Sequence, residues 1–387
     1  MSYFPSFDPG FPVATEPFDQ KNEMFKRSCW DDRFLDSGRR FYKEVVLNNR
    51  PGWGQPEFSA LNASWSLDMN FTSGIGLGNM GLYSWKGPSG RAEDYVAVGG
   101  RFEAEADKLT CLVKSAALQF GASLVGICQI HPNWVYSHEY NRKTGKHKVI
   151  NLPEGVDKAV VMAVEMNYHQ IKSKSLVLRS VAVGLGYSLM AHLANQLAIF
   201  IRGLGYTALP AGNDTALSIP MAMAAGLGEQ SRMGLLVTKK FGPRIRLCKV
   251  LTDMPVKTDK YHPFGVSEFC RTCEVCAKKC PSQSIPYGPP TESGKNISNQ
   301  SGPLKWYNDH ERCFNYWASI RTDCSQCIRV CPFNKPLSKI HDLSRFMIRF
   351  KWPLLNKVLV QLDSILGYHR TYPASVFWNE SNRYRKN

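Results

Sequence analysis

The chain has 387 residues, of which 43% are hydrophobic and 21% are charged, and its formal net charge is +16. These values exclude a disordered chain and leave room for two or three packed units. So large a positive charge favours an anionic partner or surface, although surface lysines and arginines also serve simply to keep a protein soluble.

Membrane insertion and export leave no recognisable signal in the sequence. It contains no uncharged apolar run of about 18 residues, so no membrane-spanning helix is expected. The N-terminal residues lack a basic stretch followed by an apolar one, so no signal peptide is expected either. The pair Arg39–Arg40 resembles a twin-arginine signal, but it lies too far into the chain and no apolar run follows it.

The predicted elements divide the chain into four units. Residues 1–101 are rich in Pro, Gly, Trp and Phe, and we expect an irregular, aromatic-rich covering unit. Residues 102–263 alternate between helical and strand patterns, which predicts an α/β core with a surface insertion at 131–157. Residues 264–335 are rich in cysteine, and 336–387 are expected to form a tail on the core with a helix at 351–366.

Within the core the pattern predicts individual elements. The expected helices and strands are a helix at 102–120, strands at 121–130 and 158–166, a helix at 175–205 and a strand at 206–210. A hairpin is predicted from 234–238 and 244–252, with its turn at 239–243.

The cysteines are predicted to be metal ligands. Eight of the twelve fall between Cys270 and Cys331, while the other four are scattered as single thiols: Cys29, Cys111, Cys128 and Cys248. The first group reads C-x2-C-x2-C-x3-C-P, the run by which bacterial ferredoxins hold 4Fe-4S clusters, and its fourth cysteine serves the other cluster. A zinc ribbon, the alternative, needs two separated pairs rather than one uninterrupted run.

The ferredoxin crossover assigns the eight thiolates to two clusters. One cluster takes the first three cysteines of the first run and the last cysteine of the second: Cys270, Cys273, Cys276 and Cys331. The other cluster takes the remaining four: Cys280, Cys313, Cys324 and Cys327. The protein is therefore expected to carry electrons, and the α/β core to receive them.

Several motifs resemble the corrinoid-dependent reductive dehalogenases. The distant first cysteine of the second run stands behind a core that contains SWSLDMN (64–70), GNDTALSIP (212–220), AGLGEQSRMG (225–234) and KFGPRIRLCKVLTDMP (240–255). The resemblance implies a nitroreductase-like α/β (α+β) core that binds a cobamide base-off, beside a ferredoxin-like domain with two 4Fe-4S clusters. The corrinoid contacts implied are Gly184, Gly186, Ser188, Gly226, Gly228, Ser231, Arg232 and Met233.

The resemblance also implies catalytic residues and a substrate pocket. Tyr187 would donate the proton that replaces the halide, with Arg246 and Asn213 beside it, since a cation stabilises a phenolate. If the resemblance fails, Tyr187 is instead a core tyrosine, Arg246 a surface arginine and Asn213 an ordinary turn asparagine. The implied aromatic wall of the pocket consists of Trp65, Phe71, Trp317 and Trp30, any of which is instead a core residue if the resemblance fails.

The implied partners are a small organohalide and a low-potential electron donor, namely a ferredoxin, a flavodoxin or a quinol-linked protein. A small membrane-anchor subunit and a homodimer are also implied, and nucleic acid is not. The protein is expected to be cytoplasmic if the chain is native, and membrane-associated on the outer face if a twin-arginine signal has been removed. Two alternatives stay open: an epoxyqueuosine reductase acting on tRNA, which the positive charge favours, and an electron carrier.

Overall fold

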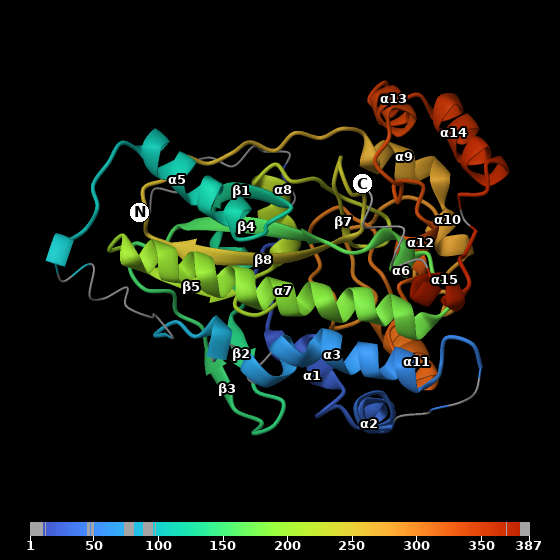
Figure 1. Ribbon diagram of the computed structural model, residues 1–387, viewed down its shortest axis with the longest axis horizontal. Coiled ribbons are helices and arrows are strands. Elements are labelled where there is room, and N and C mark those ends of the chain that lie inside the picture. Colours follow the sequence, from blue (N-terminus) through green and yellow to red (C-terminus); the bar gives the residue numbers. More distant parts are fainter. Residues whose placement is uncertain are drawn as a thin grey trace.

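The structure is a computed structural model of the chain (Figure 1), and it describes residues 13–44, 50–72, 81–87, 98–368 and 370–379 together with residues 11, 47 and 96. Its centre is a four-stranded antiparallel sheet in the order β1-β4-β8-β5. The strands are β1 (Leu124–Gln129), β4 (Lys158–Glu165), β8 (Ile245–Thr252) and β5 (Ala208–Ala211). The α+β form of the expected fold is confirmed.

Helices cover both faces of this sheet. Along β4, Val160, Met162 and Val164 point to the face covered by α5 (Ala106–Gln119) and α7 (Leu176–Gly203). The alternate residues of the same strand pack on the other face, which α8 (Ser218–Ala224) covers. A strand buried on both faces is apolar throughout, and this explains the continuous run of Val, Ala and Met at 159–164.

Helix α7 crosses the whole molecule beneath the sheet (Figure 1). It begins where the Ser175 hydroxyl accepts a hydrogen bond of 3.2 Å from the Leu178 amide, and the chain turns away at Gly205, whose φ is +85°. It is the one described helix that is long and apolar enough to cross a membrane, but 72% of its most apolar window is buried in the protein. Burial of this kind is the mark of a core helix.

The N-terminal part is more regular than the sequence predicts. It contains α1 (Met24–Arg27), α2 (Leu35–Lys43) and α3 (Gln55–Phe71), the last of which packs along α7 on the side away from the sheet (Figure 1). Gly54 precedes α3, and its amide donates to the Glu57 carboxylate at 2.9 Å. Short 3-10 turns precede α1 at Gln20–Asn22, join α1 to α2 at Asp32–Phe34, and follow α3 at Gly81–Tyr83.

The predicted hairpin is wrong. Strand β7 (Leu236–Val237) pairs with β6 (Glu229–Gln230), and a bridge from Thr238 to Gly242 closes the turn that follows. Strand β8 instead lies between β4 and β5. Because β8 is buried on both faces, it occupies a central position of the sheet, and a short β7 could satisfy only two of its eight residues.

The insertion at 131–157 forms a small hairpin that the N-terminal segment covers. Its strands are β2 (His138–Tyr140) and β3 (His147–Val149). The Ser137 amide donates to the Phe18 carbonyl at 3.0 Å, and the Tyr140 amide donates to the Gln20 side chain at 3.2 Å. The insertion therefore packs against the first described residues of the chain.

The cysteine-rich segment lies at one end of α7 (Figure 1). Its helices are α9 (Val266–Cys273), α10 (Val275–Lys278), α11 (His310–Ile320) and α12 (Gln326–Val330). The tail adds α13 (Lys339–Ile348), α14 (Pro353–Ile365) and α15 (Ala374–Asn379), of which α14 confirms the helix expected at 351–366. One hydrophobic cluster joins Met166 and Val183 of the core to Phe269 and Phe333 of the cysteine-rich segment.

Candidate active site and cluster-binding segment

Tyr187 is held on three sides by the residues that the sequence singles out. The Asn213 side-chain amide donates a hydrogen bond of 2.8 Å to its hydroxyl. The guanidinium of Arg246 lies 5.0 Å from the ring centroid, and the Trp65 ring stacks on Tyr187 at 5.0 Å with an interplanar angle of 20°. The structure thus brings together the three predicted catalytic residues and one predicted pocket residue.

Each partner reaches Tyr187 because of its place in the fold. Arg246 shares the parity of Cys248 and Val250 on β8, so its side chain points to the α7 face of the sheet. Gly186 makes room for it, since a Cβ at Gly186 would lie 2.8 Å from Arg246 Cγ. Asn213 follows β5 in a turn whose other residues are buried, and its own side chain is exposed beside the half-buried Tyr187.

A buried lysine fixes the turn that carries Asn213. Lys249 points to the opposite face from Arg246, where its ammonium donates to the Gly212 carbonyl, to the Asp214 carbonyl at 3.2 Å and to the Ser218 hydroxyl at 3.1 Å. Burial lowers the pKa of Lys249 to about 8, an effect that the nearby Asp214 opposes. Lys249 was not expected at the site, although it belongs to the KFGPRIRLCKVLTDMP motif that also contains Arg246.

Competing charges set the acidity of Tyr187. Burial raises its pKa above the ordinary value, Arg246 lowers it, and the carboxylates of Asp68 and Glu23 raise it further. The hydrogen bond from Asn213 lowers it, because an amide donor favours the phenolate. Tyr187 therefore carries its proton at neutral pH, and Arg246 limits the cost of giving it up.

Buried charges near Tyr187 were missed by the sequence analysis. Asp68 lies on α3, three residues after Trp65, and is 4% exposed. Its burial and the nearby carboxylate of Asp214 raise the pKa of Asp68 to about 6. Glu23 lies close enough to act on Tyr187 although it is far away in sequence. Asp68 belongs to the SWSLDMN motif, so the resemblance of this motif to the family could have identified Asp68 as a site residue.

The predicted aromatic wall is only partly assembled at Tyr187. Trp65 stacks there, but Trp317 packs between Phe25 at 5.8 Å and Phe41 at 6.0 Å, in an aromatic cluster of the N-terminal part. Trp30 donates from its indole nitrogen to the Lys21 carbonyl at 2.8 Å. Phe71, at the C-terminal end of α3, has an exposed side chain. A pocket role for these last three residues stays a prediction.

The cysteines gather into two groups that follow the predicted crossover. The four cysteines of the first predicted set line one small cavity: Cys270, Cys273, Cys276 and Cys331. Met233, Phe269 and Phe333 also line this cavity. All four are buried. In the second set Cys313 lies close enough to Cys324 and Cys280 for their charges to raise its pKa. The charges of Cys324, Cys313 and Cys280 raise the pKa of Cys327 in the same way.

The donor set suits iron–sulfur clusters. Burial raises the pKa of Cys273 to about 12, and burial with repulsion from Cys324 and Cys280 raises that of Cys313 to about 12. Buried thiols with such pKa values ionise at neutral pH only when a cationic centre takes their charge. Four converging thiols around one cavity therefore fit a cubane.

The two cysteine runs repeat one backbone feature. Glu274 follows Cys273 with φ +47°, and Ser325 follows Cys324 with φ +48°. Each residue in this left-handed conformation starts a short helix, α10 or α12, that carries the next cysteine. The repetition places the C-x2-C pair of each run in the same local geometry.

Arg232, expected at the corrinoid, contacts the cluster segment, and its role at a corrinoid stays a prediction. Its guanidinium donates to the Cys270 carbonyl at 2.7 Å and to the Pro286 and Gly288 carbonyls at 2.8 and 2.9 Å. Met233 lines the first cluster cavity, and the Ser231 hydroxyl binds the Leu235 carbonyl at 2.8 Å. These contacts hold the chain around the first cysteine run.

The predicted glycine cradles have structural neighbours in this fold. A Cβ at Gly184 would lie 2.3 Å from Trp65 Cδ1, so this glycine allows α3 to approach α7. Ser188 joins the same helices through a bond of 2.7 Å to the Ser64 carbonyl. Gly226 and Gly228 border a separate cavity of about 340 Å³ beside Lys239 and Lys240. Their contact with a corrinoid stays a prediction.

Several buried side chains, some near Tyr187 and others beside Cys324, have polar atoms without a hydrogen-bond partner among the described residues. Among the described residues, Asp68 Oδ2, Tyr83 Oη and Arg246 Nε lack a hydrogen-bond partner, as do Thr322 Oγ1 and Asp323 Oδ1 beside Cys324. Buried polar groups of this kind call for a partner. A cobamide carries peripheral amides that donate and accept hydrogen bonds, so these residues fit such a guest.

Helix α7 connects the candidate active site to the second cysteine run. Ser180 donates to the Asp323 carboxylate at 2.8 Å, and Arg179 donates to the Gln326 side chain at 3.1 Å. Both contacts lie on the N-terminal half of the helix that carries Tyr187. The cluster segment and Tyr187 are therefore joined through one helix.

Known proteins share both parts of this architecture. Residues 269–334 match the family described as a 4Fe-4S double cluster binding domain. The tetrachloroethene reductive dehalogenase of Sulfurospirillum multivorans is 34% identical over 383 residues, covering 87% of this chain and 75% of that protein. A protein of the same name from Desulfitobacterium hafniense is 36% identical over 327 residues, covering 74% of this chain and 59% of that protein.

A solved structure and a more distant relative complete the comparison. The catabolic reductive dehalogenase NpRdhA has a TM-score of 0.70 at 21% identity, covering 94% of this chain and 49% of its own. The chain thus spans between half and three quarters of these proteins. The epoxyqueuosine reductase of Atelocyanobacterium thalassa is 29% identical over only 32% of the chain. By the extent of its similarity in sequence, this chain belongs to the reductive dehalogenase family.

Proposed function

We propose that the protein catalyses the reductive cleavage of a carbon–halogen bond, in which an organohalide, two electrons and one proton give the reduced product and a halide ion. The observation that carries the proposal is Tyr187, which is bonded to Asn213, stacked on Trp65 and placed beside Arg246. Family membership supports the reaction type, since the relatives from two organisms are named for it.

The clusters would deliver the electrons, and a cobamide would supply the low-potential cobalt at which the carbon–halogen bond is broken. The cysteines of the first set are all buried, whereas Cys280, Cys313 and Cys327 are partly exposed. This difference in burial supports electron entry at the second set and transfer to the first. The unpaired polar atoms of Asp68, Tyr83 and Arg246, which lie near Tyr187, would support a cobamide there.

The residues of this chain supply the proton and the dry surroundings. Tyr187 keeps its proton until carbon accepts it, because burial holds its pKa above the ordinary value. Arg246 then stabilises the phenolate that remains, and a guanidinium does so without losing its own charge. Trp65 closes one side against water. Asn213 fixes the position of the hydroxyl through its hydrogen bond.

We propose small chlorinated alkenes as the first substrates to test, because the relatives act on tetrachloroethene by their names. The test is anaerobic reconstitution with cobamide, iron and sulfide, followed by measurement of chloride release with a low-potential reductant. A panel of one chloroethene, one halophenol and one haloalkane separates substrate classes. Absence of halide release from all three, in protein that holds both cofactors, would refute the proposal.

An epoxyqueuosine reductase is the second candidate, and the charge of +16 is the observation that favours it. Reduction of epoxyqueuosine in tRNA by the reconstituted protein, with no halide release, would establish it in place of the dehalogenase.

The partners and location that we propose rest on the C-terminal helices. Helices α13 and α14 expose large apolar side chains: Ile340, Leu343, Phe346, Leu354, Val358 and Leu362. An exposed apolar face of this kind supports a protein partner, and we propose a small membrane-anchor subunit there, with the enzyme held at a membrane. A ferredoxin, flavodoxin or quinol-linked donor would reduce the second cluster. Copurification with a coexpressed anchor, lost on Leu343→Glu, tests the docking.

A further inference from the structure

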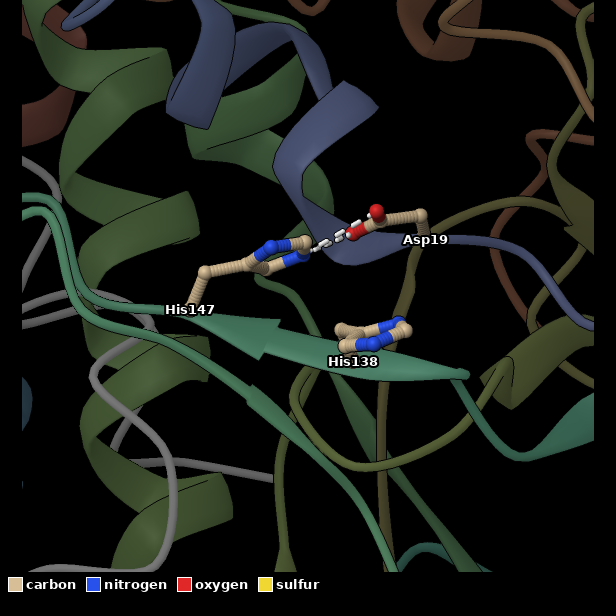
Figure 2. A group of neighbouring side chains, drawn as sticks. All are labelled: Asp19, His138 and His147. Carbon is tan, nitrogen blue, oxygen red and sulfur yellow. Dashed lines mark hydrogen bonds and ion pairs between the residues drawn. The ribbon is translucent and has the colours of Figure 1, made fainter.

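Two histidines and an aspartate converge where the N-terminal segment crosses the β2–β3 hairpin (Figure 2). Both carboxylate oxygens of Asp19 lie 3.0 Å from His147 Nε2. The rings of His138 and His147 have their centroids 4.5 Å apart. One ligand atom from each of the three side chains lies within 4.8 Å of the other two. None of these residues belongs to the candidate active site or to the clusters.

The fold builds this arrangement from three local features. Antiparallel pairing sets His138 opposite Val149 and His147 opposite Tyr140, so the two histidines are diagonal neighbours on one face of the hairpin. Asp19 arrives from the segment that is bonded to the hairpin through the Ser137 amide and the Phe18 carbonyl at 3.0 Å. The Asp19 carboxylate also accepts from the Lys21 amide at 2.9 Å, which fixes its orientation.

We propose that Asp19, His138 and His147 bind a zinc ion. Two imidazole nitrogens and one carboxylate oxygen are donors that zinc prefers, and a water completes a tetrahedron. Ligands about 2.0–2.1 Å from a tetrahedral zinc lie roughly 3.3 Å from one another. The three ligand atoms, within 4.8 Å of one another, reach that spacing by contracting about 1.5 Å at most. Side-chain rotation on a hairpin that is partly exposed supplies such a movement.

The surroundings suit the ion. Ser137 Oγ lies 3.1 Å from Nδ1 of His138, so a zinc bound at Nε2 leaves this second hydrogen bond in place. The carboxylate of Asp19 offsets part of the charge of the metal. The adjacent Lys148 lies opposite Glu139 in the strand register, so its side chain points to the other face of the hairpin.

Zinc at this position would cross-link two segments that are distant in the chain, since Asp19 and His147 are 128 residues apart. The N-terminal segment carries Trp30 and also Glu23, whose carboxylate acts on Tyr187. The ion would therefore fasten to the hairpin the segment that carries Glu23. The zinc site itself stands on the geometry of three side chains and does not depend on the reaction catalysed.

Zinc binding is tested on protein whose clusters and cobamide have been reconstituted, so that the cysteines are occupied. We expect one zinc ion per chain by anaerobic calorimetry, and X-ray absorption at the zinc edge should show nitrogen and oxygen ligands without sulfur. Saturating zinc should raise the Tm by about 2 °C or more. The variants His138→Ala, His147→Ala and Asp19→Asn should each weaken binding at least about tenfold.

His192→Ala is the matched control, since His192 is an exposed histidine on α7. It should bind zinc as the unsubstituted protein does. Asp19→Asn keeps the size and the helix-capping oxygen of Asp19, so a loss of zinc in this variant reports on the ligand rather than on folding. Unchanged zinc affinity in the three site variants, sulfur in the zinc shell, or no binding at about millimolar zinc would each overturn the proposal.

Discussion

Ser180 and Tyr187 lie on one face of α7, two helical turns apart, and Ser180 donates a hydrogen bond of 2.8 Å to Asp323 beside Cys324. Seven residues of α-helix span about 10 Å. The helix therefore sets the distance between the second cysteine run and the candidate proton donor.

Tyr187→Phe tests the proton donor. Phenylalanine keeps the stack on Trp65 but lacks the hydroxyl that accepts from Asn213. We expect halide release to fall about 100-fold or more, which is the usual contribution of a general acid. Iron and corrinoid contents should match those of the unsubstituted protein. Activity within about threefold of that protein would remove Tyr187 from the mechanism.

Arg246→Gln tests the electrostatics of Tyr187 through pH. Arg246 lowers the pKa of Tyr187, so its removal leaves burial and the acidic neighbours to raise that pKa. A general acid works only while protonated, so the alkaline limb of the kcat/KM profile should move to higher pH. The maximal rate should fall as well, because the phenolate loses its cation. Arg312→Gln, at an exposed arginine of α11, should leave the profile unchanged.

The cluster assignment is tested by pairs of cysteine substitutions. Cys331 and Cys270 line one cavity, so replacing both with serine should remove only one cluster, about four of roughly eight iron atoms per chain. Replacing Cys331 and Cys327 together should disturb both clusters. Iron analysis and electron paramagnetic resonance of the reduced protein measure the difference. Cys111→Ser, at an exposed thiol, is the control. Equal iron loss in the two pairs would contradict the crossover.

Gly184→Ala tests the close approach of α3 and α7. The added methyl group would lie 2.3 Å from Trp65 Cδ1, so the helices have to separate. Overpacking of this kind costs about 1–3 kcal/mol in the free energy of unfolding. The Tm should drop, and the stack of Trp65 on Tyr187 should loosen, which lowers activity. Gly99→Ala adds the same methyl group where no atom lies within 4 Å, so its Tm should hold.

The parts that the sequence predicted are those with a local signature. The spacing from Cys270 to Cys331 defined both cysteine sets, while the apolar run at 158–166 marked β4 and the helical pattern at 175–205 marked α7. Helix α3 escaped notice because Ser, Asn and Trp residues interrupt any apolar stripe, and it is α7 that stabilises the helix by packing. Strand β8 was paired wrongly because its partners, β4 and β5, are distant in sequence.

The residues around Tyr187 divide in the same way. Its contact with Arg246 and Asn213 followed from family motifs that were visible in the sequence. The charges of Glu23 and Asp68 were hidden, since burial of a carboxylate depends on segments that only the fold assembles. Trp317 packs against Phe25 and Phe41, and these contacts with the N-terminal helices could not be seen in the sequence.

The hydrophobic cluster that unites Met166 and Val183 with Phe269 and Phe333 has a consequence for assembly of the enzyme. Four thiols of the first set belong to that cluster, so inserting iron and sulfide completes the interior of the whole molecule. We expect denaturant to unfold both halves in a single transition, and removal of iron to loosen the sheet as well as the cysteine loops. We therefore expect insertion of the first cluster to be coupled to packing of the core against the cysteine-rich segment.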